Sequence, residues 1–439
     1  MKSDSDRKWT VMVYMAGDNN LSDRCIDDLR EMKMGLSGAG EVTVKVQVDR
    51  SSESGNEAAR YTIRGYDRAT FLDTDQALEK DKEKDAVRRV NTGSVESLVD
   101  FINWCVDARP DDHYMLVLWG HANPLDSGPM PAHALRRPSR RRRRFRRRAQ
   151  QTRRNEIPFF QICPDDFTQD ALTNIELREV LRRVSERIQR PIDILGLDAC
   201  LMSMIEMSYE VRQYANHIVA SQGLVPSTSW PYHWILASIA SNPVMSPRNL
   251  VHIIVEKFVA YYGEYDDVPV QLSACDLSRC EPIRNVVALL AEQMITKLEE
   301  EDPFLRNAIL AAHFRAQAYF EENYYDLYDF CYMLRESCGG KYPELNGACN
   351  EVMLEINDRK FPHFVIESGF KSGTETDLGF SYGTSIYFPW LPPADNYADL
   401  EFAKDSKWSE FLNIYADRIA KEAREDRAPV MITSDAASI

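Results

Sequence analysis

Short apolar segments alternate with amphipathic segments along the first 280 residues, and this alternation restricts the fold more than any other feature. Residues 9–16 (WTVMVYMA) form an apolar run that ends in the polar turn GDNN at 17–20. Residues 113–119 (HYMLVLW) and 192–197 (IDILGL) have the same character. Strands that are apolar on both faces are typical of buried parallel sheets connected by helices. The sequence therefore predicts an α/β fold with a mainly parallel sheet flanked by helices.

The predicted elements define three parts of the chain. Strands are expected at 9–16, 41–49, 60–64, 113–119, 192–197, 217–221 and 268–277, and helices at 21–34, 94–108, 173–189, 201–214, 249–262 and 283–301. Thr173 with Glu176 forms a capping-box signal. Beyond about residue 302 the pattern loosens, with strands at 364–367 and 384–388 and a helix at 408–423. We expect a polar N-terminus (1–8), an α/β domain (9–280) and an α/β C-terminal extension (281–439) that packs on it.

Composition narrows the class of protein. The chain has 439 residues, of which 44% are hydrophobic, enough to bury one large core or two ordinary ones. The polar N-terminus lacks the apolar stretch of a signal peptide, and no apolar run approaches the ~18 residues of a membrane span. Nine cysteines, an odd and widely spaced set, favour reduced thiols within the core. These features predict a cytoplasmic protein with no membrane segment, which we expect to be a monomer.

Charge is distributed unevenly. The formal net charge is −15, yet residues 136–154 contain 12 arginines and no acidic residue, so the rest of the chain is more acidic still. An acidic body repels nucleic acid and attracts basic ligands. The arginine-rich insert has three interpretations: a linker, cleaved or intact, an arm that binds nucleic acid, and a solvated low-complexity stretch. We favour the linker and expect no nucleic-acid partner.

Two residues follow apolar strands in a way that suggests catalysis. His121 and Cys200 each lie just beyond a strand, and the carboxyl ends of parallel strands line the ligand crevice of such a sheet. A helix starting near Leu201 would lower the pKa of the Cys200 thiol, and an imidazole would accept its proton. Backbone N–H groups at Gly120, Ala122 or Cys200 would hold an oxyanion. Residue types alone leave open an ordinary buried cysteine and a structural histidine.

Three segments carry a resemblance to a known family. Residues 9–21 (WTVMVYMAGDNNL), 116–122 (LVLWGHA) and 195–221 (LGLDACLMSMIEMSYEVRQYANHIVAS) resemble the characteristic segments of clostripain-type cysteine peptidases, relatives of caspases, gingipains and legumain. The likeness covers roughly residues 7–280, and residues 325–330 and 383–389 resemble the family's C-terminal part. The resemblance implies a caspase-like fold and a dyad of nucleophile Cys200 and base His121 without a third member. It also implies cleavage of polypeptides after Arg or Lys.

The resemblance gives further residues a role. It implies that Asp198 binds the basic P1 side chain, because a carboxylate pairs bidentately with guanidinium and as a point charge with Lys. The alternative is an N-cap for the helix after Cys200. Family members often cut a loop between the histidine and the cysteine, which implies self-processing within 136–154. A catalytically weak or inactive binding protein is the alternative function, since Ala122 replaces the clan's usual glycine.

Metals and cofactors receive no positive signal from the residues. No zinc-knuckle, metalloprotease or nucleotide-binding motif is present, and the chemistry requires no cofactor. The resemblance allows for calcium, since some members of the family depend on it. Acidic clusters occur at 165–166 and 300–302, but we interpret both as solvated faces and predict no metal site. The loop at 226–230 contains serines where the family pattern predicts glycine, so the wall of the substrate pocket is expected to differ.

Overall fold

The structure is a computed structural model of the whole chain. It describes residues 9–36, 41–51, 57–65, 74–83, 90–106, 112–123, 160–265, 267–319, 323–358 and 362–425. The polar N-terminus at 1–8 and the arginine-rich insert at 136–154 lie outside the described residues.

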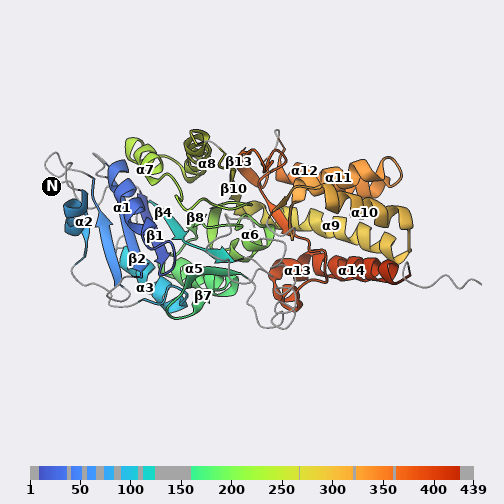
Figure 1. Cartoon of the computed structure of the whole chain (residues 1–439), viewed down its shortest axis with the longest axis horizontal. Coiled ribbons are helices and arrows are strands. Elements are labelled where there is room, and N and C mark those ends of the chain that lie inside the picture. Colours follow the sequence, from blue (N-terminus) through green and yellow to red (C-terminus); the bar gives the residue numbers. More distant parts are fainter. Residues whose placement is uncertain are drawn as a thin grey trace, which may run out of the picture.

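A large sheet forms the centre of the molecule (Figure 1). Among the described residues, eight strands follow one another in the order β13-β10-β9-β8-β4-β1-β2-β3. The five central strands, β9, β8, β4, β1 and β2, are parallel, whereas β3, β10 and β13 join the two edges antiparallel. The predicted mainly parallel sheet is therefore confirmed. The strands are β1 (Trp9–Gly17), β2 (Val42–Arg50), β3 (Glu57–Ile63), β4 (His113–Trp119), β8 (Ile192–Asp198), β9 (Ala215–Ala220), β10 (Val270–Asp276) and β13 (Val365–Lys371).

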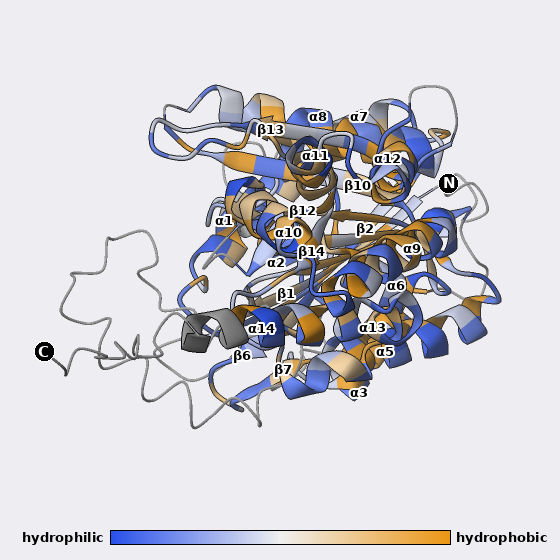
Figure 2. Cartoon of the chain, turned by 90° about the vertical axis from the view of Figure 1, so that its right-hand side faces the viewer, coloured by the Kyte–Doolittle hydropathy of each residue, from blue (hydrophilic) through white to orange (hydrophobic). Residues whose placement is uncertain are grey.

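Helices cover both faces of the sheet. One face packs against α1 (Arg24–Gly35), α7 (Tyr232–Ser241) and α8 (Pro247–Gly263). The other packs against α3 (Val95–Cys105), α5 (Asn174–Ile188) and α6 (Ile205–Val211), while α2 (Thr74–Asp81) lies beside β3. Helix α9 (Cys280–Glu299) packs mainly against helices of the C-terminal part. Apolar residues are concentrated in the strands at the centre and hydrophilic ones on the outer helices (Figure 2). Burial of both sheet faces explains why the central strands are apolar throughout.

Local signals determine where several helices begin. Thr173 and Glu176 form the expected capping box at the start of α5, with the Thr173 hydroxyl accepting a hydrogen bond from the Glu176 N–H. The helix expected from Leu201 was wrongly placed, because α6 begins only at Ile205. Leu201 has a φ of 63°, in the left-handed region that no α-helical residue adopts. The chain therefore turns directly after Cys200 instead of entering a helix.

The C-terminal part contributes to the central sheet. Its strand β13 pairs antiparallel with β10 at the sheet edge, so this part completes the sheet as well as packing on it. The boundary at residue 280 stays a prediction. The remaining elements are helices α10 (Pro303–Arg315), α11 (Leu327–Cys338), α12 (Pro343–Ile356), α13 (Glu401–Ser406) and α14 (Trp408–Glu425), 3-10 helices η2 (Leu277–Arg279) and η3 (Asp395–Asp399), and strands β11 (Ala318–Tyr319), β12 (Tyr324–Asp326) and β14 (Ser385–Tyr387).

All nine cysteines are buried, so the prediction that the thiols lie in the core is confirmed. Within the described part of the chain, no helix combines the length and the apolar character that crossing a bilayer requires. The cytoplasmic location and the monomeric state stay predictions.

Candidate active site

The ends of β4 and β8 bring His121 and Cys200 to the same edge of the sheet. These strands are adjacent and parallel, and their last residues, Trp119 and Asp198, are register partners. His121 and Cys200 each follow two residues later. Because paired strands lie about 5 Å apart, both residues leave the sheet side by side at its carboxyl edge.

Gly120 shapes the turn that precedes His121. Its φ of 145° is one that side chains rarely adopt, and a Cβ atom there would lie 3.0 Å from the carbonyl oxygen of Ala16. Its N–H donates to the carbonyl of Asp198 at 3.3 Å. The structure therefore does not favour Gly120 as an oxyanion donor, because this N–H already serves the sheet. Ala122 and Cys200 remain as candidate donors.

His121 has a hydrogen-bond partner that the sequence did not predict. Its Nε2 lies 2.7 Å from Oδ1 of Asn20, in the turn after β1. Since Oδ1 is an acceptor, this bond requires a proton on Nε2, so Nδ1 is the basic nitrogen of the neutral ring. Desolvation lowers the pKa of His121, although the carboxylate of Asp166 acts in the opposite direction. The resting imidazole is therefore neutral and able to accept a proton.

Cys200 is held by the loop that follows β9. Its Sγ accepts a hydrogen bond from the Val225 N–H at 3.3 Å and lies 3.8 Å from the Val225 carbonyl oxygen. The next residue, Leu201, donates its N–H to the carbonyl of Gly223 at 2.9 Å. These contacts fix the direction in which the thiol points. Val225 was missed by sequence reasoning because no local pattern links positions 25 residues apart.

The expected low pKa of the Cys200 thiol is wrong for this structure. Burial and, to a smaller extent, the carboxylate of Asp198 raise its pKa to about 11, while the Val225 N–H acts in the opposite direction. The helix invoked to lower it begins at Ile205, too far along the chain to act on the sulfur. The resting pair is therefore a neutral thiol and a neutral imidazole.

Asp198 lies at the end of β8 with its side chain buried, only 3% exposed. Its Oδ2 accepts hydrogen bonds from the Trp230 N–H at 3.2 Å and the Tyr232 hydroxyl at 2.9 Å. Its Oδ1 has no hydrogen-bond partner among the described residues. Burial raises the pKa of this carboxyl to about 7. The alternative role as a helix cap is wrong, because Met204 occupies the N-cap position of α6.

The loop at 226–230 lies beside Asp198. Ser229 has a φ of 57°, in a region that favours glycine. Its hydroxyl donates to the buried carboxylate of Asp28 at 2.6 Å, and Trp119 donates its indole N–H to the same oxygen. A serine at this position therefore connects the loop to a second buried acid, which a glycine would not do.

The described residues on either side of the arginine-rich insert pair with each other beside His121. Strand β5 (Ala122–Asn123) pairs antiparallel with β6 (Gln161–Asp165), and β6 pairs in turn with β7 (Asp170–Leu172). The N–H of Cys163 also donates to the carbonyl of His121 at 3.2 Å. Asn123 and Gln161, which flank the segment 124–160, are thus register partners, and Asn123 lies only two residues after His121.

Comparison with known proteins agrees with this geometry. The family model described as the clostripain family matches residues 13–128 and 152–415. The chain belongs to the clostripain family. It is a cysteine-type endopeptidase, and clostripain from Hathewaya histolytica is 23% identical over 94% of this chain and 88% of that protein.

Solved structures of the family share the fold. A secreted C11 cysteine protease from Bacteroides thetaiotaomicron, bound to an irreversible peptide inhibitor, has a TM-score of 0.60 and 17% identity, and the match covers 92% of this chain and 99% of that one. An inactive zymogen C11 protease from Parabacteroides distasonis has a TM-score of 0.60 and 18% identity over the same shares. At this level of identity the likeness establishes the fold, and the roles of individual residues rest on the geometry above.

Proposed function

We propose that this clostripain-family peptidase uses Cys200 as nucleophile and His121 as general base, and that it cuts after arginine and, less efficiently, after lysine. The main support for this dyad is the register pairing of Trp119 with Asp198. His121 and Cys200 each follow two residues after one of these partners, so both lie at the same edge of the sheet. Two strands of one sheet hold both groups at fixed separation, as general-base catalysis requires.

The neutral resting pair determines the order of proton transfers. On attack, the Cys200 thiol proton moves to Nδ1 of His121 while Sγ bonds to the scissile carbonyl carbon. The N–H groups of Ala122 and Cys200 stabilise the oxyanion that develops. His121 then gives its proton to the leaving amine, and water, activated by the same imidazole, hydrolyses the thioester. Asn20 holds Nε2, so the ring keeps the tautomer that this sequence needs.

Asp198 supports the specificity for a basic P1 residue. Its buried carboxylate accepts only neutral donors and has one oxygen unpartnered among the described residues. A guanidinium would supply both a positive charge and N–H donors, while an ammonium would supply the charge at a single point. Removing the partner of a buried charge costs on the order of 2 to 5 kcal/mol of binding.

The test measures kcat/KM for matched peptides that end in Arg, Lys, Leu or Asp at P1. We expect Arg to exceed Lys and both to exceed the others by orders of magnitude, and Asp198→Asn to remove most of that preference. Asp193→Asn is the matched control, because Asp193 is buried on the same strand at its opposite end. An unchanged Arg-to-Leu ratio in Asp198→Asn would show that the carboxylate does not bind P1.

Self-processing is the second part of the proposal. The paired strands β5 and β6 hold the ends of the segment 124–160 beside His121, so the arginines within it have a high local concentration at the active site. Wild-type protein should split within 136–154 as activity rises, and Cys200→Ala should stay intact by mass spectrometry. A wild-type chain that is active and uncut would refute self-processing while leaving the peptidase assignment intact.

A further inference from the structure

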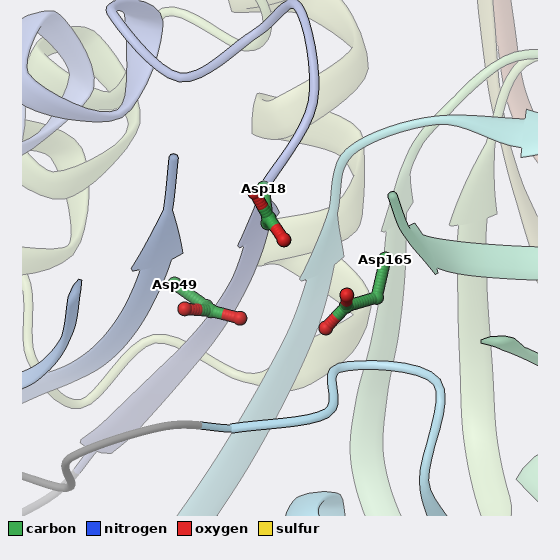
Figure 3. Close-up of side chains that lie close together, drawn as sticks. All are labelled: Asp18, Asp49 and Asp165. Atoms are coloured by element: carbon green, nitrogen blue, oxygen red, sulfur yellow. The ribbon is translucent and has the colours of Figure 1, made fainter. Parts of the chain in front are cut away.

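Three buried aspartates from distant parts of the chain meet beside the active site. Asp18 follows β1, Asp49 lies in β2 and Asp165 ends β6. Figure 3 shows their carboxylates directed toward a common space. One carboxylate oxygen from each lies within 4.8 Å of the others, and the three residues are at most 3% exposed. Asp165 is therefore not part of a solvated face, contrary to the expectation from the sequence. Glu300 and Glu301 are exposed, in agreement with it.

Asp49 provides an independent sign that the cluster binds a ligand. It is completely buried, yet neither carboxylate oxygen has a hydrogen-bond partner among the described residues. Burial, together with the carboxylates of Asp165 and Asp18, raises its pKa to about 7, and the backbone N–H of Arg50 acts in the opposite direction. Leaving a buried acceptor unsatisfied is costly, and two neighbouring carboxylates increase that cost.

The other two aspartates are already oriented by backbone donors. Asp165 accepts hydrogen bonds from the N–H groups of Thr168 at 2.8 Å and Thr92 at 3.2 Å. Asp18 accepts one from the Phe167 N–H at 3.2 Å. A carboxylate oxygen has more than one lone pair, so these bonds fix each group while leaving capacity for a cation.

We propose that Asp18, Asp49 and Asp165 bind one calcium ion. The donor set consists only of hard oxygen ligands, which Ca²⁺ and Mg²⁺ prefer over softer metals. Calcium bonds oxygen at about 2.3–2.6 Å, so two ligands of one ion lie at most about 5 Å apart, which the spacing of the cluster satisfies. Mg²⁺ requires shorter bonds and near-octahedral geometry and retains several waters, which suits a buried cluster of three carboxylates less well.

The ion would join three segments at the carboxyl edge of the sheet. It would tie the turn after β1 to the end of β2 and to the β6–β7 hairpin, which the Asp166 N–H already links to the Asp18 carbonyl at 3.1 Å. A ligand that binds only the folded chain stabilises it by mass action. Calcium should therefore raise the thermal stability of the protein whether or not the peptidase is active.

The experiment uses full-length Cys200→Ala, so that self-cleavage does not interfere and the result is independent of the proposed activity. After treatment with chelator, calcium chloride is titrated by calorimetry and Tm is measured with and without calcium. We expect one site per chain and a Tm increase of about 3 °C at ~100 times Kd. Absence of binding and of any Tm increase at millimolar calcium, or a response to magnesium alone, would overturn the proposal.

Two variants on this background distinguish the site from a general effect. Asp49→Asn should lose the calcium-dependent Tm increase, yet its Tm in chelator should be at least that of its parent, because a buried amide repels no neighbouring carboxylate. Glu206→Gln is the control, since Glu206 is also completely buried with one oxygen unpartnered. It should keep the full calcium response. An unchanged calcium response in Asp49→Asn would overturn the assignment of the ligands.

Discussion

The two ends of β8 carry buried aspartates in opposite electrostatic situations. At the amino end, Asp193 accepts hydrogen bonds from the Arg190 guanidinium and from the Tyr114 N–H, both at 2.8 Å. At the carboxyl end, Asp198 receives only neutral donors, and no ion pair to it occurs among the described residues. A carboxylate with its cation in place stabilises the fold, whereas a buried one without a cation is prepared to receive it from a ligand.

The largest expected effect is a loss of activity, which should follow substitution near the carboxyl end of β8 but not at its amino end. Cys200→Ala should lower kcat by at least about 10⁴-fold, because the nucleophile of a covalent mechanism cannot be replaced. Asp193→Asn should change kcat/KM by less than about threefold, yet lower the free energy of unfolding by roughly 1–3 kcal/mol because Arg190 loses its carboxylate partner. The measurements are peptide hydrolysis and urea unfolding. A large loss of activity in Asp193→Asn with unchanged stability would break the comparison.

The pH dependence of stability sharpens the comparison. The pKa of Asp198 is about 7 in the folded chain and near 3.8 when unfolded. Between these values the unfolded chain has lost the proton that the folded chain keeps, so Asp198 lowers stability as pH rises from about 4 to 7. Asp198→Asn on the Cys200→Ala background should remove this decrease, and its stability relative to the parent should rise by a few kcal/mol across that window. Urea unfolding at several pH values measures it, and a constant difference would contradict the buried, unpaired carboxylate.

Substitution of Asn20 tests whether the carboxyl edge of the sheet also positions the general base, His121. Asn20→Ala removes the acceptor for Nε2 of His121 and should lower kcat about tenfold, since the imidazole loses its fixed tautomer and orientation. Tm should stay nearly constant, because Asn20 is exposed. The neighbouring Asn19→Ala is the control for stability: Asn19 is buried and donates to the Ala16 carbonyl at 3.0 Å, so its Tm should fall. An unchanged kcat in Asn20→Ala would show that Asn20 does not position His121.

The smallest effect concerns the turn that leads into the amino end of β8. Gln189 ends α5 with a φ of 59° and is exposed. Gln189→Gly should stabilise the protein by about 0.5–1 kcal/mol, because glycine adopts this conformation without strain. Activity should not change, since the turn is remote from the carboxyl edge. A loss of stability in urea unfolding would show that the side chain of Gln189 contributes more than the backbone strain costs.

Much of the site was predictable because it depends on a general property of parallel sheets. Apolar strands indicated where the sheet lies, and each strand end then indicated where His121 and Cys200 leave it. The late start of the helix after Cys200 was not predictable, since the pattern of apolar residues gave no sign that Leu201 adopts a left-handed conformation. The antiparallel direction of β10 could not be predicted either, because an apolar strand has the same residue pattern whether its neighbour is parallel or antiparallel.

Contacts between distant segments account for the remaining differences. Asp18, Asp49 and Asp165 are separated by long stretches of sequence, and only the sheet order brings them together. The bond from Asn20 to His121 joins positions 101 residues apart. No period or spacing in the sequence encodes such pairs. Asp18 and Asp49 lie at or near predicted strand ends, whereas the strand that ends in Asp165 was not predicted.

The contribution of the C-terminal part to the sheet also affects the timing of synthesis. The N–H of Ser385 donates to the carbonyl of Ser203 at 2.9 Å, three residues after Cys200, and β13 closes the sheet edge beside β10. During translation the N-terminal strands emerge first. The surroundings of the nucleophile are therefore incomplete until most of the 439 residues have left the ribosome. A nascent chain that already contains both His121 and Cys200 therefore cannot yet hold them in the finished sheet.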